Sequence, residues 1–318
     1  MIARPHKANP GRDNMNRLCI YMTYNKENRI YEYIGSALKS LKRCCTKVYV
    51  VCNHINPPSG VESVVPFTDH IFYRENKGYD SGAYKDIFCN FLSRDELETY
   101  DEIVLANDSF FGFFYPLEDA FALMDESACD FWGMTGQGAG EYTNPLHSFD
   151  AHIHSYFLVF KRKVIENPVF LGFWEQMEYA SSFREAIVNF ELEINRRLKQ
   201  EGFTGKSFID VYGILPKRNE NPYYSMPYEL VKDCKVPVMK KKCVLVRNVG
   251  FASMLKTIQY LKQENLYPVH WMLSCLENQF YVPGIGNGPC NSLEIFCNSH
   301  PEIYIYGAGV CGKNLAVY

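Results

Sequence analysis

The chain has 318 residues, 47% of them hydrophobic and 15% aromatic, enough to bury the core of one large domain or two modest ones. A formal net charge of −3 and a pI near 6.3 give no basic field, which excludes nucleic acid as a partner. The short basic run Lys240–Lys242 does not change this. Twelve cysteines without a CxxC pair or zinc-like spacing indicate buried free thiols rather than disulfides.

The N-terminal segment is polar and has no apolar core of the kind found in signal peptides. We expect residues 1–16 to be disordered. No run of 18 apolar residues occurs anywhere in the sequence. These features predict a cytoplasmic protein, with peripheral association at the inner membrane face left open.

Apolar runs and helical periodicity alternate along the chain. Strands are predicted at 18–24, 47–51, 101–108, 129–134 and 151–160. Helices are predicted over 28–43, 81–92 and 117–125, twice between 168 and 202, and over 253–264. This alternation predicts a three-layer α/β/α sandwich with a central, mostly parallel sheet. Its binding site is expected at the carboxyl ends of the strands.

Three polar residues, Asn107, Asp108 and Ser109, stand at the end of the predicted strand 101–108. A carboxylate flanked by amide and hydroxyl oxygens suits Mg²⁺ or Mn²⁺, which complete their coordination with substrate phosphates and water. Asp108 could equally well cap the following turn, because Asn, Asp and Ser all favour that position. Position alone does not decide between a metal ligand and a cap.

The stretch "GYDSGAYKDIF" begins with a turn in which Gly78 and Gly82 permit a tight backbone course. Asp80 and Ser81 could accept hydrogen bonds at the start of the next helix. Asp80 could instead accept hydrogen bonds from the hydroxyl or imide groups of a nucleoside. The local pattern favours the helix cap.

Two glutamates, Glu191 and Glu193, lie near the start of the helix in "NFELEINRRLKQEGF". One helical carboxylate facing a cleft can serve as a general base toward an acceptor hydroxyl. Glu193 and Arg197 are also spaced for an i,i+4 ion pair on the surface. For either glutamate taken alone, the structural role is favoured.

Aromatic and histidine side chains give weaker signals. His152 and His154 alternate along a predicted strand and therefore share a face, which suits a metal site, an acceptor site or the core. Trp132 could stack on a sugar ring or pack in the core, and core packing is favoured for Trp174.

Together these motifs resemble the GT-A glycosyltransferases, and most closely the rhamnan synthesis protein F family. The resemblance rests on the order of "ENKGYDSGAYKDIF", "YDEIVLANDS" and "FELEINRRLKQEGF", and it covers about residues 17–245. It implies a GT-A-like domain over 17–245 with a nucleotide-sugar half (17–135) and an acceptor half (136–245). Residues 246–300 are expected to form a helical C-terminal extension and linker.

The resemblance also assigns roles to residues. It implies that Asp108 lies near the diphosphate and a divalent cation, Mg²⁺ or Mn²⁺, although "NDS" stands here in place of a full D-x-D motif. It implies that Glu191 is the catalytic base, with Glu193 as its competitor. Trp132 and His154 are expected on the acceptor side. The residues expected to bind the donor are Thr23, Tyr24, Asn53, Asn76, Gly78, Asp80, Asn107 and Ser109.

The implied reaction transfers a sugar, with L-rhamnose as one candidate, from a nucleoside-diphosphate donor to a polysaccharide or lipid-linked glycan acceptor, with inversion. Its setting would be the synthesis of cell-wall or surface polysaccharide. The incomplete "NDS" motif keeps an alternative open, in which a non-catalytic GT-A-like module binds nucleotide sugar or glycan within a synthase complex.

A final motif, "GAGVCG", places Gly307, Gly309 and Gly312 after a predicted strand, as in dinucleotide-binding turns. The remaining residues cannot supply the helix, strands and acidic residue that a Rossmann unit needs. We therefore interpret residues 301–318 as the truncated start of a Rossmann-like unit, or as a strand and helix added to the first domain, and NAD is not expected as a cofactor.

Overall fold

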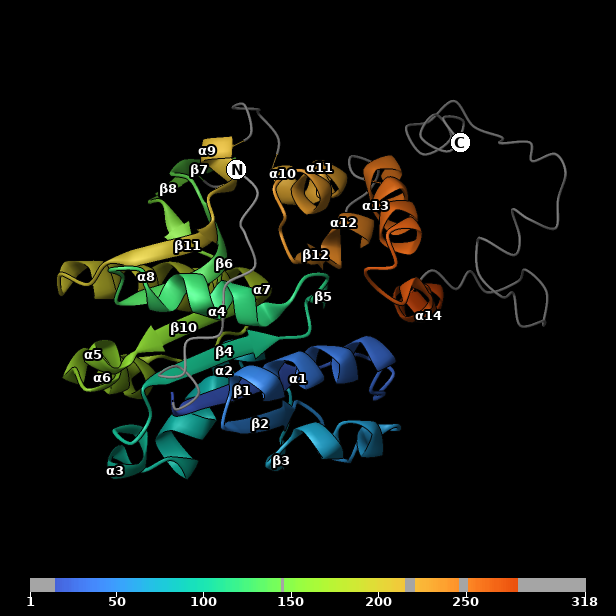
Figure 1. Cartoon of the computed structure of the whole chain (residues 1–318). Coiled ribbons are helices and arrows are strands. Elements are labelled where there is room, and N and C mark those ends of the chain that lie inside the picture. Colours follow the sequence, from blue (N-terminus) through green and yellow to red (C-terminus); the bar gives the residue numbers. More distant parts are fainter. Residues whose placement is uncertain (1–14, 144–145, 215–220, 246–250, 280–318) are drawn as a thin grey trace, which may run out of the picture.

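The computed structural model describes residues 15–143, 146–214, 221–245 and 251–279 (Figure 1). The segments predicted as a disordered N-terminus (1–14 of it) and as the start of a Rossmann-like unit (301–318) lie outside the described residues. The strands are β1 (Arg17–Thr23), β2 (Lys47–Cys52), β3 (His70–Tyr73), β4 (Glu102–Asn107), β5 (Phe110–Gly112), β6 (Phe131–Gln137), β7 (Gly140–Thr143), β8 (Leu146–Phe149), β9 (His152–Ile153), β10 (Phe157–Lys161), β11 (Gly205–Ile209) and β12 (Val238–Lys240).

Helices connect and flank these strands. The longer helices are α1 (Glu32–Cys44), α2 (Tyr79–Asp86), α4 (Leu117–Asp125), α6 (Pro168–Gln176), α8 (Glu193–Gln200), α13 (Phe251–Gln263) and α14 (Val269–Gln279). The shorter helices are α3 (Arg94–Leu97), α5 (Arg162–Ile165), α7 (Phe183–Ala186), α9 (Val211–Ile214), α10 (Pro222–Ser225), α11 (Pro227–Lys232) and α12 (Lys242–Leu245), and π-helical turns occur at η3 (Ile87–Phe91) and η4 (Ile187–Leu192). Among the described residues, no helix is long and apolar enough to cross a membrane.

The main sheet has the strand order β11-β6-β10-β4-β1-β2-β3, with β9 added beside β6. β1 runs parallel to β2 and β4, β2 to β3, and β11 to β6, whereas β10 is antiparallel to both of its neighbours. Seven-residue β1 is buried throughout, as expected for a parallel strand covered on both faces. The sheet is therefore mixed but mostly parallel.

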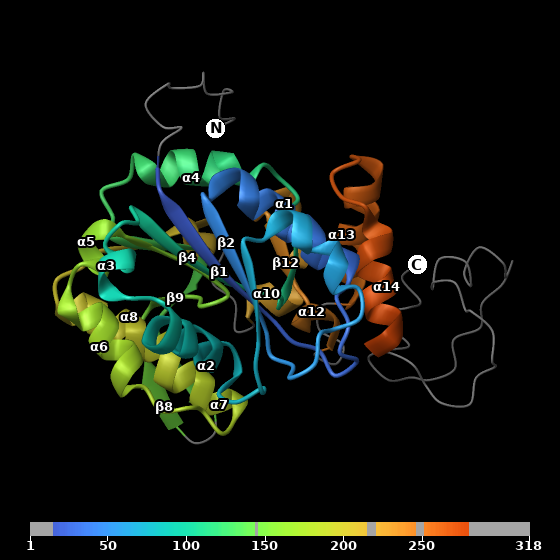
Figure 2. The ribbon, with the colours of Figure 1, turned by 90° about the horizontal axis from the view of Figure 1, so that it is seen from below.

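Helices cover both faces of this sheet, because alternate residues of each strand point to opposite sides. On β1, Cys19 and Tyr21 pack into one core with α1 and α4, and Leu18 and Ile20 pack into a second core with α2, α6 and α8. Figure 2 shows α1 and α4 on one side of the strands and α2 and α6 on the other. This arrangement confirms the predicted three-layer α/β/α fold.

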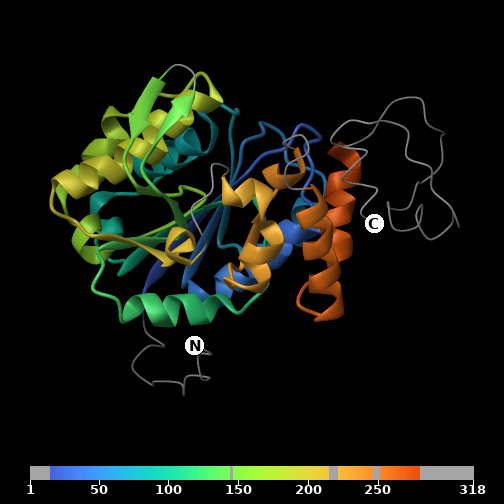
Figure 3. The same ribbon diagram turned by 90° about the horizontal axis from the view of Figure 1, so that it is seen from above.

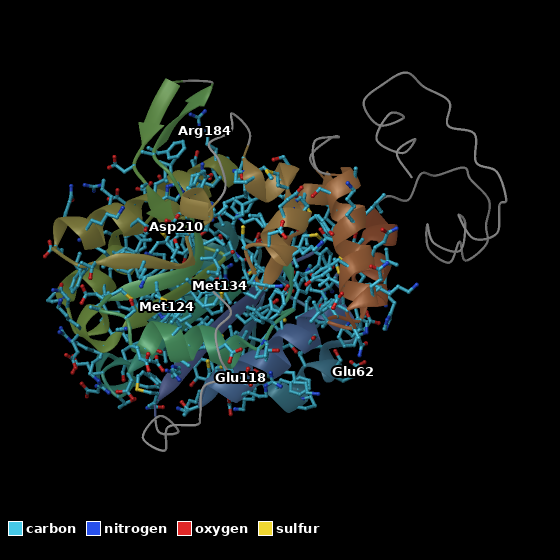
Figure 4. The ribbon with its side chains drawn as sticks, turned by 45° about the horizontal axis from the view of Figure 1, so that its top comes forward. Glu62, Glu118, Met124, Met134, Arg184 and Asp210 are labelled. Carbon is cyan, nitrogen blue, oxygen red and sulfur yellow. The ribbon has the colours of Figure 1, made fainter. Side chains whose placement is uncertain are left out.

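The C-terminal helices lie at one end of the molecule, where α13 packs against α11 and α14 lies beside α1 (Figures 1 and 3). Leu261 of α13 and Met272 of α14 are fully buried and belong to the same core as α1. A helical C-terminal segment is thus present where it was predicted, and it packs on the main domain. Figure 4 shows the side chains that fill the layers, with buried Met124 and Met134 inside and Glu118 and Glu62 nearer the rim.

One predicted strand, 151–160, is interrupted. β9 ends at Ile153 and β10 begins at Phe157. Side chains take part of the hydrogen bonds of this backbone, whereas the His154 amide still donates to the Thr135 carbonyl. Asn195 accepts from the Ile153 amide at 3.0 Å and donates to its carbonyl, and Glu191 accepts from the Ser155 amide at 2.7 Å. The chain therefore bends at Ser155 into the space beyond the sheet edge.

Candidate active site

A cavity of about 600 Å³ opens at the carboxyl edge of the sheet, within the size range of ligand sites. β1, β4 and β6 end there, and the antiparallel strand β10 begins there, since Phe157 pairs with Ala106 near the end of β4. Polar residues that follow or precede these strand ends therefore meet at one place. The polar lining includes Asn76, Asp80, Asn107, Asp108, Ser109, Gln137, His152, His154, Ser155, Glu191, Asn221, Lys240 and Lys242.

Asp108 joins the ends of two strands. Its Oδ2 accepts hydrogen bonds from the Thr23 hydroxyl at 2.9 Å and from the Tyr24 amide at 3.3 Å. The Lys241 ammonium lies 3.8 Å from the same oxygen and donates to the Tyr33 hydroxyl at 2.7 Å. Among the described residues, the contacts to this carboxylate fall on Oδ2, which leaves Oδ1 for a ligand.

Asp80 lies in the first turn of α2, whose N-cap is Gly78 in a left-handed conformation (φ 75°). Asp80 is therefore not the cap that its sequence position suggested. Its Oδ1 accepts from the Ser81 amide at 2.9 Å and its Oδ2 from the Asn107 side chain at 2.8 Å. Burial raises the pKa of Asp80 to about 6, although these two hydrogen bonds act in the opposite direction.

Glu191 enters the cavity from the π-helical turn η4. Its Oε2 accepts from both the amide and the hydroxyl of Ser155 at 2.7 Å, and Nε2 of His152 lies 3.5 Å from its Oε1. Burial alone would raise the pKa of Glu191, but the contact with His152 and the surrounding positive charges hold it well below its ordinary value. Glu191 is therefore an ionised carboxylate anchored at the bend between β9 and β10.

His154 lies beside His152, with 5.9 Å between ring centroids. Its Nδ1 is 3.0 Å from the hydroxyl of Thr135, which is also hydrogen-bonded to Tyr156 at 2.7 Å. Burial and the charge of Lys240 lower the pKa of His154 well below its ordinary value. This histidine is thus a neutral hydrogen-bonding group in the cavity wall.

Lysines complete the cavity beside Tyr156 and Phe183, where the charges of both Lys240 and Lys242 act on Glu191. β12 pairs antiparallel with β5, which places Lys240 opposite Phe110, and the Lys241 amide donates to the Ser109 carbonyl at 2.9 Å. Nζ of Lys240 lies 4.7 Å from the ring centroid of Tyr156, and Nζ of Lys242 lies 3.2 Å from that of Phe183. Two ammonium groups therefore face the carboxylates across the same cavity.

Most residues predicted to bind the donor are found here. Tyr24, Asn76, Asp80, Asn107, Asp108 and Ser109 line the cavity, as do Glu191 and His154. Thr23, Asn53 and Gly78 form a layer behind it. Asn53 donates to the Asn76 side chain at 2.9 Å and to the Tyr79 carbonyl at 3.0 Å, so it fixes the turn rather than lining the cavity.

Two predicted site residues lie elsewhere. Trp132 is fully buried in the core beneath the sheet, with its ring 5.2 Å from that of Phe121, because its position on β6 points toward α4. It cannot stack on a sugar there. Glu193 points away from the cavity and forms ion pairs with Arg196 at 2.6 Å and Arg197 at 2.8 Å. Of these two glutamates, Glu191 lines the cavity and Glu193 does not.

The donor set around Asp108 does not fit a divalent cation held by the protein. The Asn107 amide is engaged on both sides, since its oxygen accepts from the Ser109 amide and its nitrogen donates to Asp80. An ammonium group, that of Lys241, already stands beside the carboxylate. Over the described part of the chain, no group of three or more His, Cys, Asp or Glu side chains is placed to hold a metal. A cation at Asp108 remains a prediction.

Sequence reasoning missed the lysines and two aromatic rings. Tyr79 and Phe183 line the cavity with ring centroids 6.4 Å apart, and either could present a face to a sugar or base. The run Lys240–Lys242 was visible as a basic patch. Its place in the site depends on the pairing of two three-residue strands far apart in the chain, for which the sequence carries no local signal.

A mostly parallel α/β sheet with a carboxylate- and lysine-lined cavity at its carboxyl edge defines an α/β protein with a candidate ligand site at the usual place for this class of fold. The family described as "Rhamnan synthesis protein F" matches residues 48–283, more than half of the chain. The chain belongs to this family, which supports a transferase of polysaccharide synthesis.

A curated relative is the "Uncharacterized protein y4gN" of Sinorhizobium fredii (strain NBRC 101917 / NGR234), 26% identical over 137 residues, covering 42% of this chain. The alignment spans only 33% of that relative.

Solved structures with a similar fold include 4-diphosphocytidyl-2C-methyl-D-erythritol synthase from Anaerococcus prevotii DSM 20548 (TM-score 0.38, 8% identity, 57% of this chain and 86% of that one). Another is core-mannan synthase A from Aspergillus fumigatus in its Mn/GDP form (TM-score 0.32, 9% identity, 58% and 70%). A third is a cytidylyltransferase from Leptospira borgpetersenii (TM-score 0.34, 12% identity, 79% and 96%). All three TM-scores are below 0.5, so these likenesses place neither a substrate nor a residue role on this chain.

Proposed function

We propose that this protein transfers a sugar from a nucleoside-diphosphate donor to a hydroxyl group of a polysaccharide or lipid-linked glycan. One observation carries the proposal. Asp80, Asp108 and Glu191 meet Lys240 and Lys242 around one cavity at the carboxyl edge of the sheet. Carboxylates suit the hydroxyl groups of sugars, and ammonium groups suit a diphosphate. The family membership of the chain supports the same setting, and L-rhamnose is the candidate sugar that the family's name suggests.

The donor would lie along the ends of β1 and β4. Tyr24 stacks on His54 with 4.9 Å between ring centroids and leaves an exposed aromatic edge for a base. The Asn76 amide and the Asp80 carboxylate line the same cavity as Tyr24. Both can accept hydrogen bonds from hydroxyl or imide groups of a nucleoside. The diphosphate would then point toward Lys240 and Lys242, on the other side of Asp108.

The acceptor would approach from the side of Glu191, His152 and His154. In a single displacement, the acceptor oxygen forms a bond to the anomeric carbon while the bond from that carbon to the diphosphate oxygen breaks. The acceptor proton passes to Glu191, and the nucleoside diphosphate leaves with the bonding electron pair. Attack from the face opposite the leaving group inverts the anomeric configuration.

The geometry of Glu191 supports the role of base. Ser155 holds Oε2 through two hydrogen bonds of 2.7 Å, so Oε1, which lies 3.5 Å from Nε2 of His152, is the oxygen that would receive a proton. The depressed pKa keeps the group ionised, as a base must be, although it also limits its basicity. Asp80 has a higher pKa than Glu191, and it is hydrogen-bonded to Asn107 at the end of β4.

The experiment is a panel of UDP-, dTDP- and GDP-sugars offered to the full chain, with binding measured by calorimetry and turnover by release of nucleoside diphosphate. Binding of one nucleotide class with turnover is the expected result. Absence of binding across the panel would reject the proposal. Binding without turnover, with every acceptor tried, would favour a non-catalytic nucleotide-sugar-binding module.

A further inference from the structure

Among the described residues, the two cavity lysines form no ion pair within 4 Å, although the charge of Glu191 acts on both, whereas Lys241 between them contacts a carboxylate directly. Lys241 is engaged by Asp108 and the Tyr33 hydroxyl. Lys240 instead lies over the ring of Tyr156, and Lys242 lies over the ring of Phe183. A cation–π contact of this kind attracts the ammonium group but carries no negative charge that would neutralise it. Both line the cavity, and both are partly buried.

Their position relative to Asp108 is fixed by backbone contacts. The β12–β5 pairing aligns Lys240 with Phe110, two residues after Asp108, and the Lys241 amide donates to the Ser109 carbonyl. The lysine run and the segment that ends β4 therefore form one rigid unit. In this unit Lys241 is the cationic partner of the Asp108 carboxylate. The ammonium groups of Lys240 and Lys242 can therefore contact a ligand.

We propose that Lys240 and Lys242 bind the diphosphate of the donor directly and take the place of a divalent cation. Two ammonium groups can offset the charge that develops on the leaving diphosphate, which is the task that a metal performs in many phosphate sites. This inference rests on the proposed function and adds a specific consequence to it. A nucleoside diphosphate binds this protein with the same affinity in EDTA as in Mn²⁺ or Mg²⁺.

The test measures binding of UDP, dTDP and GDP to the full chain by calorimetry, in EDTA and with each metal. The variants are Lys240→Met, Lys242→Met and the double substitution, which keep the length and apolar contacts of the side chain. Lys232→Met is the matched control, because Lys232 also lies over an aromatic ring, 5.0 Å from that of Tyr228, but outside the cavity. Circular dichroism spectra and thermal melting of each variant show whether it is folded.

We expect equal affinity with and without metal, a loss of about tenfold or more for each single variant, and no change for Lys232→Met. Binding that appears only with Mn²⁺ or Mg²⁺ would overturn the inference and leave the proposed function standing. Metal-independent binding that survives the double substitution would also overturn it. Absence of binding under all conditions would reject the proposed function itself. The comparison of wild-type protein with and without metal tests metal independence even where a variant does not fold, since binding that needs Mn²⁺ or Mg²⁺ overturns the inference without any variant.

Discussion

Lys241 lies 3.8 Å from the carboxylate of Asp108, although the two residues are 133 positions apart in the sequence. The contact ties the turn after β12 to the end of β4, beside the cavity that Asp108 lines. It also gives Asp108 a cationic partner that belongs to the protein. The site is therefore built as a balanced set of charges rather than as an acidic pocket.

Asp108 is expected to stabilise the fold as well as the site. In Asp108→Ala the Thr23 hydroxyl loses its acceptor and the Lys241 ammonium loses its counter-ion. We expect the free energy of unfolding to fall by about 1–3 kcal/mol, measured by chemical denaturation. Thr23→Val removes the hydrogen bond from the Thr23 hydroxyl to Asp108 and should lower the free energy of unfolding by about 1 kcal/mol. Equal stability of Asp108→Ala and the wild type would show that these contacts are not formed.

Trp132 is expected to matter for stability and not for binding. The substitution Trp132→Leu removes the buried ring and its contacts with Phe121 and Phe157. We expect the free energy of unfolding to fall by about 2–4 kcal/mol. UDP affinity, measured by calorimetry on the folded variant, should be unchanged. Tyr24→Leu is the counterpart at the cavity and should show the reverse pattern. A loss of UDP affinity in Trp132→Leu without a loss of stability would contradict this placement.

Binding of nucleoside diphosphate should weaken at alkaline pH. Burial and the charge of Lys240 lower the pKa of Lys242 to about 8, while Glu191 and Asp80 act in the opposite direction. The ammonium form exists below this pKa, so UDP affinity should be highest near pH 7 and fall by about tenfold toward pH 9.5. The phosphate groups of UDP keep a constant charge in this range, since their last pKa is about 6.

Lys242→Arg is the matched variant for this pH dependence, because a guanidinium stays protonated throughout the range. Its affinity profile should be flatter than that of the wild type, with the remaining slope due to Lys240. A wild-type profile that is flat between pH 7 and 9.5 would show that Lys242 does not meet the ligand as a cation.

Asp80 is expected to lower the stability of the free protein at neutral pH. Its folded-state pKa of about 6 lies above the ordinary value for Asp, so the folded state favours the protonated form. The resulting loss of stability grows as the pH rises from about 4 to 6 and is complete above 6. Asp80→Asn should therefore stabilise the protein at pH 8, by at most about 2 kcal/mol, and have little effect at pH 4. Stabilisation that is equal at both pH values would contradict this account.

The parts of the site that were predictable from sequence are those fixed by local order. Asn107, Asp108 and Ser109 follow a buried strand, and parallel strands place such residues at one edge of a sheet. Gly78 could be assigned to a tight turn, and its left-handed conformation bears this out. The fold class followed from the alternation of strands and helices.

The rest depends on contacts between distant segments. Trp132 and His154 both lie on apolar stretches that were predicted as strands, and only the three-dimensional position separates a core residue from a cavity residue. Glu191 lies in the π-helical turn η4 and contacts Ser155, whereas Glu193 follows this turn and forms an ion pair with Arg196. Neither difference has a signature in the sequence.

The most direct test of the proposed function compares Glu191→Gln with Glu193→Gln, using the nucleotide sugar that the wild type binds. The account predicts that Glu191→Gln keeps donor affinity within about threefold and loses turnover by about 10²–10⁴-fold, while Glu193→Gln resembles the wild type in both. The measurements are calorimetry for binding and release of nucleoside diphosphate for turnover. Normal turnover in Glu191→Gln, or its loss in Glu193→Gln with Glu191 intact, would contradict the assignment of the base.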